Sequence, residues 1–560
     1  MNSMTGAELT IRLLERQGIS TIAGIPGGAN LPLYDALYNS DKIRHVLARH
    51  EQGAGFIAQG MARTTGKPQV CFATSGPGAT NILTAIADAK LDSIPVICIT
   101  GQVPSGMIGS DAFQEVDTYG LSIPITKHNF LIRSVAELLE AIPAAFSIAT
   151  SGRPGPVLID IPKDIQNQEI SFDIWPEPGV ATKPTPAKPK DLQQAATMIN
   201  RAKRPILYLG GGTIMSNASN RARELMTKSN IPTTMTLMAL GAIPADHELS
   251  LGMLGMHAAP YTNMALEACD LLIAVGARFD DRATGKVSAF CPNAKIIHID
   301  IDPSELSKIK QAHIGITGDV NTVLKELLPM IADNSRCEWI EEINHLKNVH
   351  PFIAPNRDKA GSAYGSIQKI AEIVGDDAIV ATDVGQHQMR TAQLYPLRKP
   401  RRWLTSGGLG TMGFGLPAAI GAALAEPDNT VICITGDGSL MMNIQELATA
   451  VEQQANIKIF LMNNNALGLV HQQQTLFYGQ RTFASDYATH MDFMTIAKGF
   501  GISTYDLGSS EKHAEIIEAA LELNGPALIH IPIDVNEQVL PMVPPGAPNS
   551  EMIGGASNAA

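Results

Sequence analysis

The strongest chemical signal in this 560-residue sequence is a glycine-flanked acidic turn that is followed, further along the chain, by asparagines. The turn GDGS (residues 436–439) directly follows the apolar run TVICIT, and Asn464 stands just past a second apolar run, IKIFLM. Both runs are predicted to be buried parallel strands, whose carboxyl ends bind ligands in open α/β sheets. Asp437 could supply a carboxylate, Asn464 an amide oxygen and a nearby backbone carbonyl a third oxygen to Mg²⁺.

The same turn suits a phosphate group. Glycines let backbone N–H groups approach phosphate oxygens, which would complete the coordination of the cation. A plain tight turn is the alternative for GDGS taken alone. Paired with NN at this spacing, however, it resembles the thiamine-diphosphate fingerprint. That resemblance implies Mg²⁺ ligands from Asp437, Asn464 and the main-chain oxygen of Ala466, and cofactor contacts from Gly438 and Ser439.

A second candidate is Glu51, in the segment RHEQGA (residues 49–54) before a run of small and apolar residues. A glutamic acid in an apolar pocket can share its proton with a ring nitrogen instead of losing it to solvent. The alternative is a solvated charge near a helix start. The segment is similar to the RHEQGA of acetohydroxyacid (acetolactate) synthases. This implies that Glu51 hydrogen-bonds the aminopyrimidine of thiamine diphosphate and promotes proton loss from its thiazolium ring.

The resemblance to these synthases covers nearly the whole chain. It implies an enzyme of branched-chain amino acid biosynthesis that decarboxylates pyruvate and transfers the two-carbon unit to a second 2-ketoacid. The products would be 2-acetolactate from pyruvate, or 2-aceto-2-hydroxybutyrate from 2-ketobutyrate. The motifs are GIPGG (24–28), TSGPGATN (74–81), ITGQV (99–103), DAFQE (111–115), TKHN (126–129), GRPGPVLIDIPKD (152–164), GARFDDR (276–282) and GGLGTMGFGLPAAIGA (407–422).

Further thiamine-diphosphate contacts follow from the resemblance. Met412 matches the apolar side chain that supports the bent cofactor, and a flexible thioether fills such an irregular gap well. We interpret His387 as a hydrogen-bonding ligand in preference to a general base. The full set of matching contacts is Pro26, Ser75, Asn81, Gln386, His387 and Gly410.

Arg282, which ends GARFDDR, resembles the family's partner for the acceptor carboxylate, since a guanidinium matches two oxygens. A surface ion pair with Asp280 or Asp281 is the alternative. Gln114 and Lys163, together with Phe113, match residues of the substrate approach.

Gln473 stands where most biosynthetic synthases carry tryptophan, so the chain resembles the bacterial isozyme type with glutamine at the acceptor-specificity position. A polar, flexible side chain offers little apolar contact to the extra methyl group of 2-ketobutyrate. We therefore expect mainly acetolactate, with weak preference for 2-ketobutyrate. The alternative is that Gln473 points to solvent and other residues set acceptor choice.

The middle of the chain carries glycine turns after strand-like runs, in LYLGGG (207–212) and LGMLGMH (251–257). GGG is not the dinucleotide fingerprint, and close helix–sheet packing alone could require the glycines. With GARFDDR and IIHIDID (296–302) they resemble the FAD-binding domain of the biosynthetic synthases, where the flavin is chiefly architectural. The matching residues are Arg153, Gly210, Gly211, Gly212, His257, Arg278, Asp300 and Asp319.

These residues must be positioned by alternating elements. Short Val- and Ile-rich runs alternate with amphipathic stretches, which predicts an α/β fold of three doubly wound parallel-sheet domains. The proline-rich segment 175–190 predicts an extended linker. We expect a pyrimidine-binding domain (1–175), a central FAD-associated domain (190–335), a diphosphate- and Mg²⁺-binding domain (360–545) and a tail (546–560). The hexapeptide VICITG occurs at 96–101 and 431–436, by chance or because two sheets are related.

Bulk properties narrow the class of partner. A formal charge of −12 argues against a nucleic-acid partner. The six cysteines lack metal-ligand spacing and predict reduced thiols in a cytoplasmic protein. We read the start of the chain as a mature helix and residues 413–425 as a buried helix, with no membrane span. The resemblance implies a homodimer or tetramer, because the cofactor lies between the first domain of one chain and the third of another, and a small regulatory subunit.

Three rival functions remain. A thiamine-diphosphate pyruvate oxidase would pass electrons to the flavin, but RHEQGA and RFDDR favour ligation. The FAD-free catabolic synthase is opposed by the middle-domain glycines. A catalytically inactive scaffold is opposed by Glu51, Met412, Asp437 and Asn464, which are all present.

Overall fold

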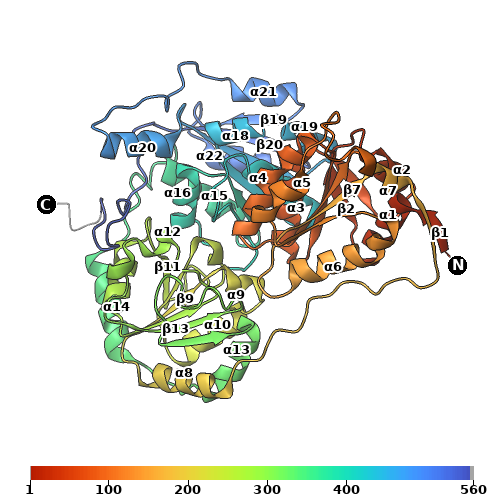
Figure 1. Cartoon of the computed structure of the whole chain (residues 1–560). Helices are drawn as coiled ribbons and strands as arrows, with labels where there is room; N and C mark the ends of the chain where they lie inside the picture. The colour runs from red at the N-terminus through yellow and green to blue at the C-terminus, as the bar shows by residue number, and fades with distance from the viewer. Residues whose placement is uncertain (1, 555–560) are drawn as a thin grey trace.

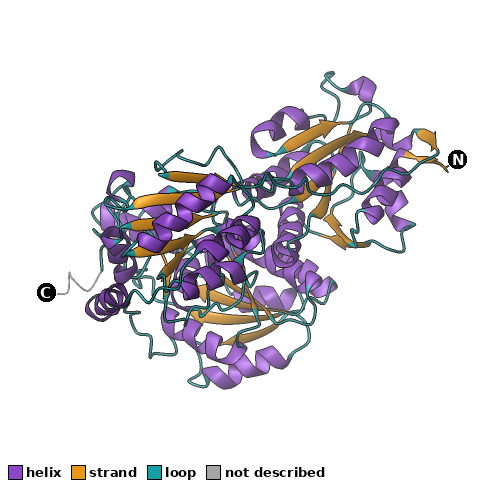
Figure 2. Cartoon of the chain, turned by 90° about the horizontal axis from the view of Figure 1, so that it is seen from below, coloured by secondary structure: helices purple, strands orange, loops and turns teal. Residues whose placement is uncertain are grey.

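Three six-stranded parallel sheets, with helices on both sides of their strands, make up most of the computed structural model, which describes residues 2–554 (Figures 1 and 2). The strands are short runs of β-branched and apolar residues that are buried on both faces, as parallel sheets require. The predicted fold class is confirmed.

The first domain has the strand order β3-β2-β4-β5-β7-β6, and a small antiparallel pair, β1 with β8, ties its ends together. Its strands are β1 Asn2–Thr5, β2 Thr21–Gly24, β3 Arg44–Leu47, β4 Gln69–Ala73, β5 Val96–Gln102, β6 His128–Leu131, β7 Val157–Pro162 and β8 Glu169–Phe172. Its helices are α1 Gly6–Arg16, α2 Leu31–Tyr38, α3 Glu51–Thr65, α4 Pro77–Leu91, α5 Thr118–Ser122, α6 Leu138–Thr150 and α7 Lys163–Asn167.

The middle domain has the order β11-β10-β9-β12-β13-β14, typical of dinucleotide-binding folds. Its strands are β9 Pro205–Leu209, β10 Thr233–Met235, β11 Ser250–Met253, β12 Leu271–Val275, β13 Lys295–Asp300 and β14 Ile314–Thr317. Its helices are α8 Pro189–Arg201, α9 Gly211–Met215, α10 Ser219–Lys228, α11 Pro260–Ala268, α12 Asp281–Thr284, α13 Val320–Leu327 and α14 Cys337–Val349.

The third domain has the order β16-β15-β17-β18-β20-β19. Its strands are β15 Ile379–Thr382, β16 Trp403–Leu404, β17 Val431–Gly436, β18 Ile457–Asn463, β19 Ser503–Asp506 and β20 Ala527–Pro532. Its helices are α15 Ala363–Val374, α16 Gln386–Leu394, α17 Gly415–Ala425, α18 Asp437–Met442, α19 Glu446–Glu452, α20 Gly468–Phe477, α21 Phe493–Gly499 and α22 His513–Glu522.

The first and third sheets have the same strand order when each is counted from its own first strand. The two copies of VICITG nevertheless lie at different positions, on β5, the fourth parallel strand of one sheet, and on β17, the third of the other. The repeated hexapeptide is therefore a product of strand composition and not of equivalent positions.

Two helices join the first and third domains within one chain. Helices α3 and α17 cross so closely that a Cβ on Gly60 would lie 2.1 Å from the Ala418 carbonyl oxygen, and one on Gly421 equally close to that of Ile57. Phe56 packs edge-on against Phe414 at 5.3 Å. Helix α17 is buried on nearly every side, and no helix within residues 2–554 is long and apolar enough to cross a membrane. The glycines permit the close crossing.

Long irregular segments run between the domains. Residues 173–188 contain no helix or strand and run along the outside of the molecule from β8 to α8 (Figure 1). After β20, the segment 534–554 returns across the middle domain, where the Val543 N–H donates to the Met256 oxygen at 2.9 Å and the Lys286 N–H to that of Ala547 at 3.0 Å. The chain that follows the third sheet therefore packs against the middle domain.

Candidate functional site

The turn after β17 places a carboxylate without an ionic partner in a buried position. Asp437 is 2% exposed, and its Oδ2 has no hydrogen-bond partner in the described chain. Burial raises the pKa of Asp437 to about 6, against the opposing effect of backbone N–H groups such as those of Gly438 and Ala466. A buried oxygen left without a partner calls for an unseen ligand, and a cation would satisfy it. The site therefore fits Mg²⁺.

The neighbouring strand β18 brings Asn464 to the same edge, because β17 and β18 pair directly up to Gly436 and Met462. The Ala466 N–H donates to Asn464 Oδ1 at 3.2 Å. Within residues 2–554 there is no cluster of three or more His, Cys, Asp or Glu suited to a metal. The candidate ligands are accordingly one carboxylate with amide and carbonyl oxygens, a set that Mg²⁺ accepts.

Other predicted cofactor contacts of the third domain surround this turn. Ser439 Oγ donates to the Val384 oxygen at 2.7 Å. A Cβ on Gly438 would lie 3.5 Å from Met412 Cε, and one on Gly436 would lie 2.9 Å from His387 Nδ1. Burial lowers the pKa of His387 to about 3, and its Nε2 has no partner in the described chain. A neutral imidazole with a free ring nitrogen is suited to hydrogen-bond a ligand.

Gln386 is placed differently from a free phosphate ligand. Its Nε2 donates to Gln472 Oε1 at 2.9 Å and to the Glu537 oxygen at 3.2 Å. Both amide hydrogens are therefore used inside the protein.

In the first domain, Glu51 is the first residue of α3 and is buried. Asn81 Nδ2, from α4, donates to Glu51 Oε2 at 3.0 Å, so the two predicted residues do meet. Ser75, in the turn just before α4, is buried, whereas Pro26 is exposed. Within residues 2–554, no hydrogen bond or ion pair joins Glu51 or Asn81 to the Asp437 turn.

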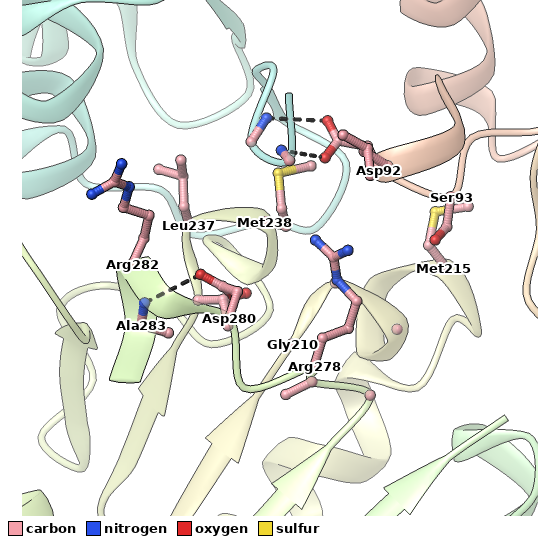
Figure 3. Close-up of a pocket in the computed structure, with 18 of the residues that line it drawn as sticks. Asp92, Ser93, Gly210, Met215, Leu237, Met238, Arg278, Asp280, Arg282 and Ala283 are labelled. Carbon is pink, nitrogen blue, oxygen red and sulfur yellow. Dashed lines mark hydrogen bonds between the residues drawn. The ribbon is translucent and has the colours of Figure 1, made fainter. Parts of the chain in front are cut away.

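A cavity of about 750 Å³ lies where the three domains meet (Figure 3). All eight residues that matched the flavin contacts border it, together with Gly410, Arg282 and Gln473. Its walls come from Ser93 and Arg153 of the first domain, the glycine turn of the middle domain, and Gly408 of the third.

Hydrogen bonds order the wall of this cavity. Arg153 Nε donates to Ser93 Oγ at 2.8 Å and its Nη1 pairs with Glu305 at 2.8 Å. Burial raises the pKa of Asp300 to about 6 and lowers that of His257 to about 4. Asp319 caps α13 by accepting from the Thr322 N–H at 2.9 Å.

Packing accounts for part of the glycine turn. A Cβ on Gly210 would lie 2.1 Å from the Gly276 oxygen, and one on Gly212 would lie 2.8 Å from the Gly276 Cα. Close packing thus requires both glycines, whether or not a ligand binds. Gly211 meets only Met238.

The predicted substrate residues are spread over all three domains, with Gln473 on α20 of the third. Arg282 is largely exposed, and its contact with Asp281 is long, at 3.8 Å, so that pair is weak. Asp280 instead caps α12 through the Ala283 N–H (Figure 3). Gln114, with φ +61°, lies against Gly76 in the first domain, and Lys163 begins α7. Neither Gln114 nor Lys163 borders the cavity.

Sequence reasoning missed a buried charge cluster beside the cavity. Arg63 of α3 pairs with Asp88 at 3.2 Å and with Asp92 at 2.8 Å. Asp92 also accepts from the N–H groups of Gly407 and Gly408, at 3.1 and 2.7 Å (Figure 3). Spacing of Asp88 and Asp92 by one helical turn was the available signal, since such residues share a helix face.

Comparison with known proteins agrees with this arrangement. The chain matches the family "Thiamine pyrophosphate enzyme" in its N-terminal TPP binding domain (residues 4–121), its central domain (192–327) and its C-terminal TPP binding domain (383–531). It is 61% identical to the acetolactate synthase isozyme 1 large subunit of Escherichia coli, over 98% of each chain. It is 47% identical to the isozyme 2 large subunit, over 98% of this chain and 99% of that one. A probable acetolactate synthase large subunit of Methanocaldococcus jannaschii is 46% identical over 97% of this chain and 94% of its own. The chain therefore belongs to the thiamine pyrophosphate enzymes and, among them, to the acetolactate synthase large subunits.

Proposed function

We propose that this chain catalyses the condensation of two 2-ketoacids, chiefly two molecules of pyruvate into 2-acetolactate, using thiamine diphosphate, Mg²⁺ and FAD. The observation that carries the proposal is the buried oxygen of Asp437, without a hydrogen-bond partner among residues 2–554 and close to Asn464 and Ala466. It stands in a chain of which 98% aligns with an acetolactate synthase large subunit. Bound thiamine diphosphate would supply the nucleophilic carbon and take up the electrons left by loss of CO₂.

The residues of the chain divide the remaining tasks. Asp437, Asn464 and the Ala466 carbonyl would hold Mg²⁺. His387, neutral because of its burial, would hydrogen-bond the diphosphate through Nε2. Met412, next to Gly438, would support the bent cofactor from below. Glu51, oriented by Asn81, would hold a proton on the aminopyrimidine nitrogen.

The acceptor ketoacid brings a carboxylate, for which Arg282 on the cavity wall is our candidate partner. Gln114 and Lys163 do not border the cavity. They would therefore contact the substrate from a second chain, or at a point outside this cavity. FAD would occupy the three-domain cavity, with an architectural role.

Two chains would build each complete site, because no hydrogen bond or ion pair joins Glu51 to the Asp437 turn within residues 2–554 of one chain. We therefore propose a homodimer or tetramer. The relatives are named large subunits, which supports a small regulatory subunit as a further partner. The six free cysteines, five of them buried, support a cytoplasmic location.

Product analysis tests the proposal. Purified protein supplied with pyruvate, thiamine diphosphate, Mg²⁺ and FAD should form acetolactate with little oxygen uptake, and omission of any one cofactor should lower the rate. Oxygen consumption equal to pyruvate consumption would instead support the oxidase. Glu51→Gln should keep the cofactor yet slow hydrogen exchange at its thiazolium carbon, since an amide cannot share a proton in the same way.

A further inference from the structure

Gln472 is a buried glutamine in α20 that no predicted role includes. Its side chain is 1% exposed and turns away from the cavity that the next residue, Gln473, borders. Gln472 Oε1 accepts from the Val539 N–H at 2.9 Å, and its Nε2 donates to the Val539 oxygen at 3.0 Å. Because a backbone unit offers its donor and acceptor at fixed places, this reciprocal pair determines which end of the Gln472 amide is oxygen.

The orientation of the Gln472 amide in turn determines that of the Gln386 amide. With Gln472 Oε1 facing it, Gln386 must present Nε2, and the observed contact is 2.9 Å. The second Nε2 hydrogen goes to the Glu537 oxygen at 3.2 Å. Gln386 Oε1 is then left facing the other way.

Gln386 Oε1 in turn faces Asn464 Nδ2, at 3.5 Å. Asn464 therefore keeps its oxygen on the opposite side, where the Ala466 N–H donates to Oδ1 at 3.2 Å. The same Ala466 N–H group faces the Asp437 carboxylate. The Asn464 oxygen, and not its NH₂ group, is thus turned towards the candidate metal turn.

Gly468 leaves the space that this chain of amides needs. A Cβ at position 468 would lie 2.6 Å from Gln386 Oε1 and 2.7 Å from Asn464 Nδ2. Any larger residue would push the two amides apart. Gly468 supports the same contact independently of Gln472.

We propose that Gln472 is a positioning residue for the Mg²⁺ site, which sets the orientation of the Asn464 amide through Gln386. The proposal rests on the function proposed above, in which Asn464 is a metal ligand. An Asn464 side chain turned by 180° would offer NH₂ hydrogens to a cation and lose the ligand. Outer partners of metal ligands typically change metal affinity by about 10- to 100-fold, and we expect a loss in that range without Gln472.

The test measures the apparent Mg²⁺ affinity by calorimetry. Mg²⁺ is titrated into the full chain in the presence of thiamine diphosphate and FAD and in the absence of pyruvate. Gln472→Met, which keeps the buried volume, should weaken the apparent Mg²⁺ affinity about 10- to 100-fold, while FAD affinity stays unchanged. Gly468→Ala should show the same selective loss. It also keeps the proposal testable if Gln472→Met does not fold.

Gln393→Met is the matched control. Gln393 also uses its amide on backbone oxygens of the returning segment and the middle domain, donating to the oxygens of His257 at 3.0 Å and Leu540 at 3.4 Å. In the described part of the chain no hydrogen bond joins Gln393 to Gln386 or Asn464, so its replacement should leave Mg²⁺ affinity unchanged.

A double-mutant cycle distinguishes an effect of Gln472 on the orientation of the Asn464 amide from a general effect on the stability of the Mg²⁺ site. Asn464→Asp has two equivalent oxygens, so its orientation no longer matters. In that background Gln472→Met should cause no further loss of Mg²⁺ affinity. An equal loss in both backgrounds, or none in the parent, would overturn the role of Gln472. If Asp437→Ala keeps full Mg²⁺ affinity, the metal site itself is wrong, and that failure is distinct.

Discussion

Gln473 borders the cavity, as do the apolar residues Met256 and Leu469, and is at the same time exposed to solvent. Its amide can leave the cavity wall, so it gives the acceptor little fixed apolar surface. Gln473→Trp should therefore raise the preference for 2-ketobutyrate over pyruvate, by at most the roughly 10- to 200-fold that one methylene can confer in an apolar pocket.

A competition assay with both ketoacids, analysed for the two products, measures that ratio. The parent enzyme should show weak preference. A strong preference for 2-ketobutyrate in the parent, or an unchanged ratio in Gln473→Trp, would show that other residues choose the acceptor.

Asp160, on β7, is a buried carboxyl that accepts from Thr100 Oγ1 at 2.7 Å and from Gln102 Nε2 at 3.0 Å. Burial raises its pKa to about 7. The folded protein then binds a proton that the unfolded chain releases near pH 4, so the stability contributed by Asp160 is full below that pH. It is lost as the pH rises to about 7, by at most about 1.4 kcal/mol per pH unit.

Asp160→Asn should flatten this part of the pH dependence of unfolding, measured with urea between pH 5 and 8. The exposed Asp35→Asn in the same domain is the control and should retain the parent slope. An identical slope in Asp160→Asn and the parent would contradict the assignment.

At the scale of elements, the loop 406–413 is held by two carboxylates of another domain. Asp92 accepts from the N–H groups of Gly407 and Gly408, and Asp88 accepts from Thr411 Oγ1 at 2.9 Å and from Ser406 Oγ. The loop contains Met412, and its residues 406–410 form part of the cavity wall. Helix α4 therefore positions a wall of the third domain.

Asp92→Ala should loosen this loop and leave Arg63 with Asp88 as its remaining ionic partner. Removing one partner of a buried pair costs about 3–5 kcal/mol, so the variant should unfold earlier in urea and bind FAD more weakly. The exposed Asp41→Asn serves as control. Parent-like stability and flavin affinity in Asp92→Ala would show that Asp88 holds the loop alone.

These elements also show what sequence reasoning can reach. Strands such as β4, β12 and β17 follow from short runs of apolar and β-branched residues, and the Asp437 turn follows from its place after such a run. The hydrogen bonds of Asp92 and Gln472 do not follow from the sequence, because the partner of Asp92 lies 315 residues away and that of Gln472 lies 67 residues away. Gln472 is the first of three consecutive glutamines, and nothing in the local sequence distinguishes it from the other two. The packing need for Gly210 and Gly212 likewise appears only once Gly276 is placed beside them.

At the scale of the whole molecule, FAD would bridge three domains at once. A ligand that binds only the folded state at 100 times its Kd stabilises that state by about 2.7 kcal/mol. We therefore expect saturating FAD to raise the melting temperature and to make the three domains unfold in a single transition. Calorimetry measures both effects.

Cleavage of segment 173–188 by thermolysin, which cuts before apolar residues, gives the internal control. Ile174 is 85% exposed and does not border the cavity, so cutting there should be equally fast with and without FAD. Separate transitions that FAD does not shift would place the flavin elsewhere.

The return of residues 534–554 over the middle domain has a consequence for biosynthesis. During translation the middle sheet leaves the ribosome complete, since its strands are contiguous from Pro205 to Thr317. Domains generally fold as units, the earlier ones first. The contacts of Met256 and His257 with Val543 and Pro541 can form only after the third domain has been made. The nascent chain thus passes through a stage in which the cavity between the three domains is folded on one side and open on the other, and closing it is among the last steps of maturation.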